Sequence, residues 1–279
     1  MQQHWFITGV SGGLGLAMAL EAAKRGHKVV GTLRKAEQIA EFEANFPQLF
    51  KGILLDVRQK NKMEEAVNEA IAFMDSIDVL VNNAGYGLIG AVEELTEAEI
   101  RDQMEVNFFG ALFLSQLVLP EMRQNRKGHI FNISSIAGVN GAAGLALYNA
   151  SKFALEGFSE GLMLETRPLD IRVTIVEPGP FRTAWAGGGL VHAAKQLNDY
   201  EPLTRLLRER LERVNGKQAG DPEKAARLIC DVALSEEAPL RLLLGAPGYQ
   251  VVEAKYKRQT EEYQKWKDKG LATDFPEGL

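Results

Sequence analysis

The chain has 279 residues, of which 46% are hydrophobic and 25% are charged, and its formal net charge is −5. This composition is typical of a globular protein with ample core material, and the small negative charge gives no indication of a nucleic-acid or membrane-surface binder. The first residues lack the features of a signal peptide, and no uncharged apolar run reaches the length of a transmembrane helix. The one cysteine, Cys230, excludes an internal disulfide and fits a reducing compartment, so we expect a cytoplasmic protein.

Short apolar segments alternate with amphipathic segments up to Pro180. The apolar segments predict strands at residues 4–8, 28–33, 52–55, 77–81, 128–134 and 171–176. The amphipathic segments predict helices at residues 16–26, 36–46, 60–74, 97–124 (interrupted near Pro120) and 146–167. Strands that read as continuous apolar runs and alternate with helices indicate a parallel sheet that is buried on both faces.

The chain after Thr183 has a different character. A glycine-rich joint at 186–190 leads into a charged helical segment at 191–214, and a break at 216–220 follows. Asp221 and Pro222 then predict a capped helix start, residues 240–244 a seventh strand and residues 249–268 a polar helix. We predict one doubly wound, Rossmann-type α/β domain over residues 1–279, with a seven-stranded and mostly parallel sheet. Residues 184–220 form either a substrate lid or a surface helical insertion.

A glycine cluster at residues 8–15 lies at the first strand-to-helix turn. Glycines there let backbone amides approach a pyrophosphate, to which the following helix presents its positive end. The spacing of Gly9, Gly13 and Gly15 is not that of the common GxGxxG fingerprint, and a glycine cluster is often only a tight turn. Because it directly follows the first strand, we predict nucleotide binding.

The end of the second strand carries Arg34 and Lys35 and no acidic residue. An acidic residue there would bind the ribose 2′-hydroxyl of NAD, whereas an arginine accommodates the 2′-phosphate of NADP. Arg34 can donate two hydrogen bonds to a phosphate, with Ser11 as a second donor, so we predict NADP(H). The alternative is a solvated basic turn.

Tyr148 and Lys152 lie one helical turn apart in the helix predicted at 146–167. A phenol normally keeps its proton until about pH 10, and a cation within about 4–6 Å favours the phenolate. The spacing therefore predicts that Lys152 lowers the pKa of Tyr148, which would make the pair an acid–base catalyst. The same spacing recurs at Tyr263 and Lys267, which we interpret as a solvated helix face.

Several motifs occur in the order of one enzyme family. Residues 8–15 are similar to a TGxxxGxG turn, residues 82–85 to an NNAG motif, and Tyr148 with Lys152 to a YxxxK pair preceded by a serine, Ser135. The chain thereby resembles the short-chain dehydrogenase/reductase family, densely from residue 4 to about residue 183 and in outline beyond. The resemblance implies hydride transfer between a nicotinamide and a carbonyl or secondary alcohol carbon.

The resemblance also implies residue roles. Tyr148 would donate or accept the proton, Ser135 would hydrogen-bond the substrate oxygen, and Lys152 would reach the ribose of the cofactor. Asn107 would hold a water in a proton relay, or would only satisfy backbone groups where its helix kinks. Ser134 is the alternative to Ser135, since only one of them can face the site. The implied cofactor contacts are Gly9, Ser11, Gly12, Gly13, Leu14, Gly15, Arg34, Asp56, Val57, Asn83, Ala84, Gly85, Tyr148, Lys152, Pro178, Gly179 and Thr183.

These features predict an NADP(H)-dependent oxidoreductase. Residues 32–34 and 177–183 are similar to the hydroxysteroid and retinol dehydrogenase-like branch, which implies a lipophilic ketone or secondary alcohol. Many NADP-preferring relatives carry a basic residue where this chain has Gly12, so the cofactor prediction depends on Arg34. The alternatives are an NAD-dependent alcohol dehydrogenase and a non-catalytic NADP(H)-binding sensor. The four histidines lack metal-ligand spacing, so we expect no metal, and the resemblance implies a homodimer or homotetramer paired through 97–124 and 146–167.

Overall fold

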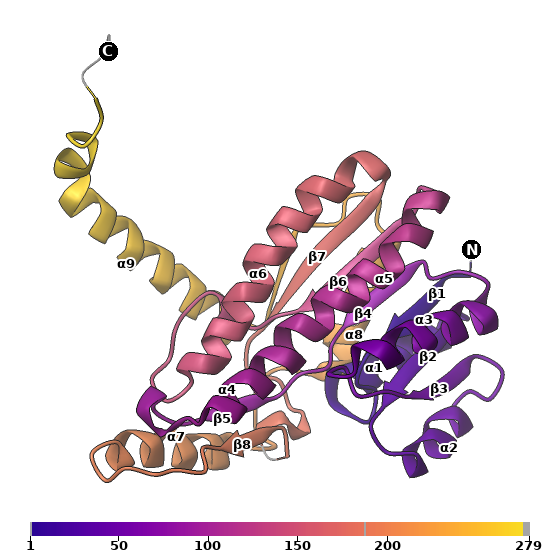
Figure 1. Ribbon diagram of the computed structural model, residues 1–279, viewed down its shortest axis with the longest axis horizontal. Helices are drawn as coiled ribbons and strands as arrows, with labels where there is room; N and C mark the ends of the chain where they lie inside the picture. The colour runs from indigo at the N-terminus through magenta and orange to yellow at the C-terminus, as the bar shows by residue number, and fades with distance from the viewer. Residues whose placement is uncertain (1, 187, 276–279) are drawn as a thin grey trace.

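Seven parallel strands form the central sheet of the computed structural model, which describes residues 2–186 and 188–275 (Figure 1). Their order is β3-β2-β1-β4-β6-β7-β9, and every neighbouring pair is parallel. The strands are β1 (His4–Ile7), β2 (Lys28–Leu33), β3 (Phe50–Leu54), β4 (Val79–Asn82), β6 (Gly128–Ile133), β7 (Ile171–Pro178) and β9 (Arg241–Leu244). The predicted doubly wound α/β fold is confirmed.

Helices cover both faces of this sheet. The first layer consists of α3 (Lys60–Met74), α4 (Glu97–Met104), α5 (Gly110–Asn125) and α6 (Ala146–Thr166). The second layer consists of α1 (Gly13–Lys24), α2 (Glu37–Ala44) and α8 (Pro222–Leu234). Each layer closes its own apolar core, with Phe6 and Leu80 in the first and Trp5 and Val81 in the second. Burial on both faces explains why the strands read as continuous apolar runs.

The long helix predicted at 97–124 is broken at a different place from the one expected. A π-helical turn, η2 (Glu105–Phe109), separates α4 from α5, whereas α5 continues through Pro120. Proline removes one backbone donor, and Pro120 lies on the exposed side of α5, where water can satisfy the carbonyl that loses its partner. The prediction of an interruption near Pro120 was therefore wrong.

The segment predicted as a helix at 191–214 is partly extended. β8 (Leu190–His192) pairs with β5 (Gly87–Ile89) in a separate two-stranded parallel sheet, and α7 (Glu201–Val214) begins only beside Pro202. Three-residue strands are too short to give a period in the sequence, which explains the error. Gly187, in the predicted joint, lies outside the described residues. As predicted, Asp221 caps α8 by accepting hydrogen bonds from the amides of Glu223 and Lys224.

The C-terminal helix α9 (Ala246–Leu271) is longer than predicted and projects away from the body (Figure 1). Tyr263 is 66% exposed and Lys267 is exposed, so this copy of the YxxxK spacing is a solvated face, as predicted.

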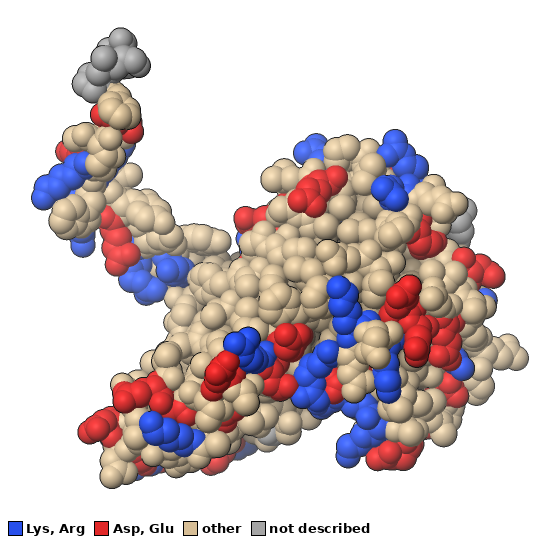
Figure 2. Space-filling view, in the orientation of Figure 1, with Lys and Arg blue, Asp and Glu red and all other residues tan. Residues whose placement is uncertain are grey.

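In the view of Figure 2, basic and acidic side chains are interspersed over the body and along α9. None of the helices in the described ranges combines the length and the apolar character that a membrane crossing requires. Four short 3₁₀ turns complete the fold: η1 (Val92–Glu94), η3 (Ile136–Gly138), η4 (Arg167–Leu169) and η5 (Ala184–Ala186).

Candidate active site

The strand order reverses between β1 and β4, so the helices that follow these two strands lie on opposite faces of the sheet. In an open parallel sheet, such a switch point leaves a crevice at the carboxyl ends of the strands. The segments that follow β1 and β4 are the glycine cluster and the NNAG motif. The topology therefore brings two of the predicted motifs to one edge.

The turn from β1 into α1 requires glycine at several places. Gly9 and Gly13 have φ values of +72° and +60°, a region that other residues rarely adopt. A Cβ on Gly15 would lie 2.4 Å from the carbonyl oxygen of Gly9 and 2.5 Å from Nδ2 of Asn83. Gly12 differs, because a Cβ there would meet no atom of the described chain within 4 Å. Packing therefore does not explain Gly12, which leaves open space at the start of α1.

The amides of residues 11–15 surround this space. Within the described ranges they donate to no backbone or side-chain acceptor, and the first turn of α1 carries no acidic residue. Unpaired amides at the positive end of a helix attract phosphate groups. The turn therefore fits the pyrophosphate of a dinucleotide, and Ser11, Gly12, Gly13, Leu14 and Gly15 would hold it.

The NNAG motif fixes the shape of this turn. The amides of Asn83 and Ala84 both donate to Oγ1 of Thr8 at 2.9 Å. Nδ2 of Asn83 donates to the carbonyl oxygens of Thr8 (2.8 Å) and Gly9 (3.0 Å). These bonds join the ends of β1 and β4, so the motif holds the glycine turn open as well as supporting the sheet.

The end of the crevice near β2 and β3 carries the residues predicted for the adenosine half of a dinucleotide. Arg34 follows β2 and is exposed, and neither it nor Lys35 forms an ion pair within the part of the chain that the structure describes. Asp56 follows β3, and Val57 packs against Gly110. Hydrogen bonds from Arg58 lower the pKa of Asp56, so this carboxylate is ionised at neutral pH.

Arg58 was not predicted from the sequence. Its Nη1 donates to Asp102 of α4 at 2.6 Å, and the hydroxyl of Tyr86 donates to the other oxygen of the same carboxylate at 2.8 Å. The chain from Asp56 through Arg58 and Asp102 to Tyr86 connects the adenosine end with the segment after the NNAG motif. A basic residue two positions after Asp56 is the only signal in the sequence for this network.

The four residues of the predicted catalytic set come from three elements. Tyr148 and Lys152 lie on α6, Ser135 follows β6, and Asn107 lies in the π-helical turn. Nζ of Lys152 lies 6.0 Å from the centre of the Tyr148 ring and donates to the carbonyl oxygen of Ile133 at 2.7 Å. A Cβ on Gly85 would lie 3.2 Å from Oδ1 of Asn107 and 3.6 Å from Nζ of Lys152. The structure therefore brings the set together beside the NNAG motif.

The prediction that Lys152 lowers the pKa of Tyr148 was wrong for this structure. Burial raises the pKa of Tyr148 to about 12, and the neighbouring Ser135 hydroxyl opposes this only in part. Burial also lowers the pKa of Lys152 to about 8, although Glu156 opposes that shift. Both side chains are about 95% inaccessible to solvent, so the loss of hydration is the largest influence on both groups, and neither shift includes a contribution from the other member of the pair. At neutral pH the phenol keeps its proton.

Ser135, not Ser134, faces Tyr148. The hydroxyl oxygen of Ser135 accepts a hydrogen bond from the amide of Ala137 at 3.1 Å, which leaves its proton available to another acceptor. Ser134 points to the other side, toward Gly138 and Glu156. The assignment of the two serines follows the alternation of side chains at the end of β6.

Asn107 makes the contacts of a structural residue. Its Oδ1 accepts from the amide of Tyr86 at 3.0 Å, and its Nδ2 donates to the carbonyl oxygen of Tyr86 (2.9 Å) and to Oγ of Ser151 (3.1 Å). These bonds match the alternative in which the residue satisfies backbone groups at a kink. Its role in a water relay stays a prediction.

The segment after β7 closes the crevice from the opposite side. The amide of Gly179 donates to Leu244 of β9, and a Cβ on Gly179 would lie 3.1 Å from the amide nitrogen of Gly248. Thr183 lies beside the glycine turn. Its Cβ is 3.5 Å from the position that a Cβ added to Gly13 would occupy. Thr183 therefore lies where it can contact a dinucleotide bound at the turn, whereas Pro178 and Gly179 lie at the end of β7 beside β9 and their cofactor contacts stay predictions.

Apolar side chains cover Tyr148. The rings of Trp185 and Tyr148 have centres 5.5 Å apart, and Leu190, Leu207 and Leu211 pack on the same cluster. Trp185 lies in the segment 184–220, for which the sequence predicted either a lid or an insertion, and no period or motif singled out this indole. Beside the phenol the site is therefore apolar.

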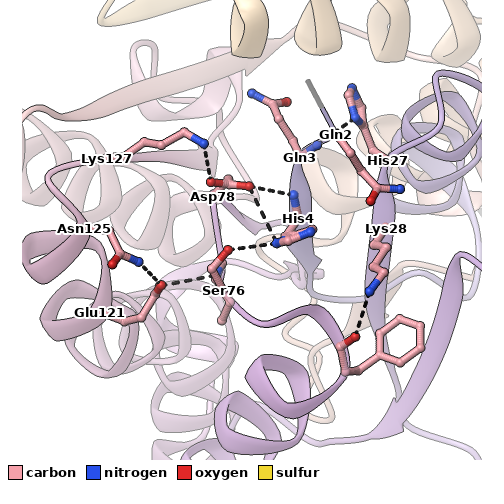
Figure 3. A network of polar contacts seen from close by, with 12 residues as sticks. Gln2, Gln3, His4, His27, Lys28, Ser76, Asp78, Glu121, Asn125 and Lys127 are labelled. Carbon is pink, nitrogen blue, oxygen red and sulfur yellow. Dashed lines mark hydrogen bonds and ion pairs between the residues drawn. The ribbon is translucent and has the colours of Figure 1, made fainter.

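A second polar cluster lies at the opposite, amino-terminal edge of the sheet (Figure 3). Nδ1 of His4 is 2.8 Å from Oγ of Ser76 and 3.8 Å from Asp78, which also pairs with Lys127. A nucleophile relay needs the serine and the carboxylate on different ring nitrogens, whereas here both approach Nδ1. The cluster therefore joins the first strand to its neighbours and performs no catalysis of this kind.

The strand order, the glycine turn and the buried pair of Tyr148 and Lys152 describe an α/β protein whose crevice suits a dinucleotide. Residues 3–188 match the family model described as short chain dehydrogenase. A 3-ketodihydrosphingosine reductase of Bacteroides thetaiotaomicron is 40% identical over 256 residues (90% of each chain), and the oxidoreductase BOA17 of Botryotinia fuckeliana is 36% identical over 275 residues (98% of this chain and all of that one). The crystal structure of a short-chain dehydrogenase from Streptomyces avermitilis has a TM-score of 0.91 and 36% identity over 98% of both chains.

The chain belongs to the short-chain dehydrogenase/reductase family. It is an oxidoreductase that acts on carbonyl or CH–OH groups.

Proposed function

We propose that the protein is an NADP(H)-dependent reductase of lipophilic ketones. The observation that carries the proposal is the position of Tyr148: a protonated phenol, flanked by Ser135 and Lys152, lies in an apolar surrounding at one end of a crevice whose other end carries Arg34. Such a phenol is a proton donor, and proton donation to a carbonyl oxygen is the half of a reduction that the protein itself must perform.

The side chains divide the reaction between them. When bound, the nicotinamide supplies the hydride. Ser135 donates a hydrogen bond to the carbonyl oxygen, Tyr148 transfers its proton to that oxygen as negative charge develops, and the ammonium of Lys152 stabilises the phenolate that remains. The amides of residues 11–15 would hold the pyrophosphate on the turn that Asn83 fixes through its hydrogen bonds to Thr8 and Gly9, and Pro178, Gly179 and Thr183 would orient the nicotinamide half. The apolar cover of Trp185 and Leu190 excludes water from the reacting atoms.

The pKa of Tyr148 predicts how the rates of reduction and oxidation depend on pH. With a pKa of about 12, only about one phenol in 10⁵ is ionised at pH 7, so the proton donor needed for reduction is fully present and the base needed for oxidation is scarce. We expect alcohol oxidation to rise by up to about tenfold per pH unit between pH 6 and 8 and more slowly above pH 8, where Lys152 loses its charge, with carbonyl reduction nearly constant between pH 6 and 7.5. Steady-state rates in both directions over this range measure the effect. Oxidation that does not depend on pH would contradict it.

The proposed preference for NADP(H) depends on Arg34. Replacing it by aspartate removes a charge-assisted contact to the 2′-phosphate and adds a repulsive charge, whereas the 2′-hydroxyl of NAD(H) gains an acceptor. We expect Arg34→Asp to weaken NADPH binding by roughly 100-fold and to leave NADH binding equal or tighter. Titration of the cofactor-free protein with each nucleotide measures both constants, and Lys62→Ala, which removes an exposed cation of α3, serves as the control. Equal losses for both nucleotides would contradict the assignment.

The apolar surroundings of Tyr148 support an uncharged, lipophilic substrate. Trp185, Leu190 and Leu207 bring no charge to the cluster. One relative is named a 3-ketodihydrosphingosine reductase, and the substrate in that name is a lipid ketone. A panel of ketones matched in size but differing in charge and chain length tests the substrate class through NADPH oxidation. We expect turnover to increase with chain length and to fail for charged members. Tight NADPH binding without turnover of any ketone in the panel would instead support the alternative of a non-catalytic NADP(H)-binding sensor.

We also propose self-association through α4, α5 and α6. On α6, the large apolar side chains of Phe153 and Leu164 are 44% and 67% exposed, and they lie about three turns apart on the same face of the helix. Sedimentation velocity would show a dimer or tetramer, and substituting both residues by aspartate would yield monomers.

A further inference from the structure

A group of charged residues lies behind the catalytic pair, where the last residues of β7 adjoin the start of β9. Nη1 of Arg241 donates to Glu156 and Glu177, and its Nη2 donates to Glu160. The side chains of Glu156 and Glu177 are only 6% and 4% exposed, whereas that of Glu160 is 52% exposed. One guanidinium therefore faces three carboxyl groups, two of them inside the protein. Its single positive charge does not neutralise all three carboxylates.

Glu156 lies one helical turn beyond Lys152 on α6, and both side chains are buried. The second carboxylate oxygen of Glu156, Oε1, and Oγ of Ser134 pair with no other group within the described chain, and the Ser134 hydroxyl, whose hydrogen bond lowers the pKa of Glu156, is the neighbour of that oxygen. Both atoms lie close to one point, since a Cβ on Gly138 would be 2.9 Å from Oε1 and 2.6 Å from Oγ. The oxygen of Glu156 that Arg241 leaves free is thus held in a site closed to solvent.

The charges around Glu156 come from every element that packs on it. They are Arg241 of β9, Glu177 of β7, and Lys152 and Glu160 of α6, with the polar but neutral Ser134 after β6. Burial, together with the nearby charge of Glu177, raises the pKa of Glu156 to about 7. In turn, the charge of Glu156 opposes the lowering of the pKa of Lys152 by burial. The two groups therefore titrate in neighbouring pH ranges and influence each other.

We propose that Glu156 is a positioning residue for the acid–base step, whose buried carboxylate keeps the ammonium of Lys152 charged in a site that would otherwise favour the neutral amine. The guanidinium of Arg241 holds the carboxylate in place through its other oxygen, Oε2. The proposal concerns the charge of Lys152 itself, and it depends on the proposed function only for its effect on catalysis.

The test measures the protonation of Lys152 in the cofactor-free protein. The Cε resonance of ¹³C-lysine reports the charge of each amine, and the spectrum of Lys152→Arg assigns the resonance. We expect Glu156→Gln to lower the titration midpoint of Lys152 by about one pH unit. Glu160→Gln serves as the matched control, because it removes an exposed partner of the same guanidinium, and should leave the midpoint in place. Glu156→Asp, which retains the charge, should restore most of the shift.

A folded Glu156→Gln protein with an unaltered Lys152 midpoint would overturn the proposal. If that variant does not fold, the test uses the unsubstituted protein. Its Lys152 resonance should show a second inflection near pH 7, where Glu156 ionises. The absence of this inflection would also overturn the proposal. In a ketone reduction assay, Glu156→Gln should move the alkaline limb of the kcat/KM profile to lower pH by the same amount. A shifted midpoint without any turnover would uphold the inference and reject the proposed function.

Discussion

Replacing Tyr148 by phenylalanine is expected to lower kcat/KM for ketone reduction by roughly 10³-fold, within the range that general-acid catalysis contributes. The substitution removes one oxygen and leaves the ring in its packing against Trp185, so fold and NADPH affinity should hardly change. Steady-state kinetics and a cofactor titration on the same preparation measure both quantities.

The chain contains its own control for this substitution. Tyr263→Phe alters the exposed tyrosine of the second YxxxK spacing on α9 and should leave kcat/KM unchanged. A Tyr148→Phe protein that reduces ketones at the unaltered rate would show that another group or water donates the proton.

Replacing Lys152 by methionine is expected to lower kcat/KM by roughly 10²- to 10³-fold without the loss of stability that a buried substitution usually causes. The folded-state pKa of Lys152 is about 8 against an ordinary 10.5, so the ammonium form opposes folding below pH 8, and this cost disappears between about pH 8 and 10.5. Methionine removes that cost, on the order of 2–3 kcal/mol, but leaves the carbonyl oxygen of Ile133 without its donor, which costs about 1–3 kcal/mol.

The two contributions nearly cancel at pH 7. We therefore expect the free energy of unfolding of Lys152→Met to lie within about 1 kcal/mol of the unsubstituted protein at pH 7, and to fall below it above pH 10. Urea unfolding at the two pH values measures the difference, with Lys267→Met on α9 as the exposed control. A loss of several kcal/mol at pH 7 would show that the buried ammonium stabilises the fold.

Much of the fold could be predicted because its signals are local and repeated. The continuous apolar runs of β1, β2 and β4 and the amphipathic pattern of α3 each arise from a few neighbouring residues. β5 and β8 could not be predicted, since each has three residues and gains its strand conformation only from pairing with the other. Pro120 was misleading because the effect of a proline depends on which side of the helix meets solvent.

The candidate site likewise combines residues that a motif identified with properties that only the folded structure determines. Motif spacing identified Ser135, Tyr148 and Lys152, and the structure brings them together. The pKa of Tyr148 could not be predicted from that spacing, because it depends on how deeply both groups are buried, and burial comes from residues as distant as Trp185 and Leu190. Arg58 and Arg241 were missed for a related reason: each acquires its partners only through the fold.

A single-turnover experiment tests the central proposal most directly. The protein, preloaded with NADPH, is mixed with a reducible long-chain ketone, and the decay of the reduced nicotinamide signal is followed at pH 7. The account predicts a fast exponential decay for the unsubstituted protein and one roughly 10³-fold slower for Tyr148→Phe, at equal cofactor occupancy. Equal decay rates for the two proteins would contradict it.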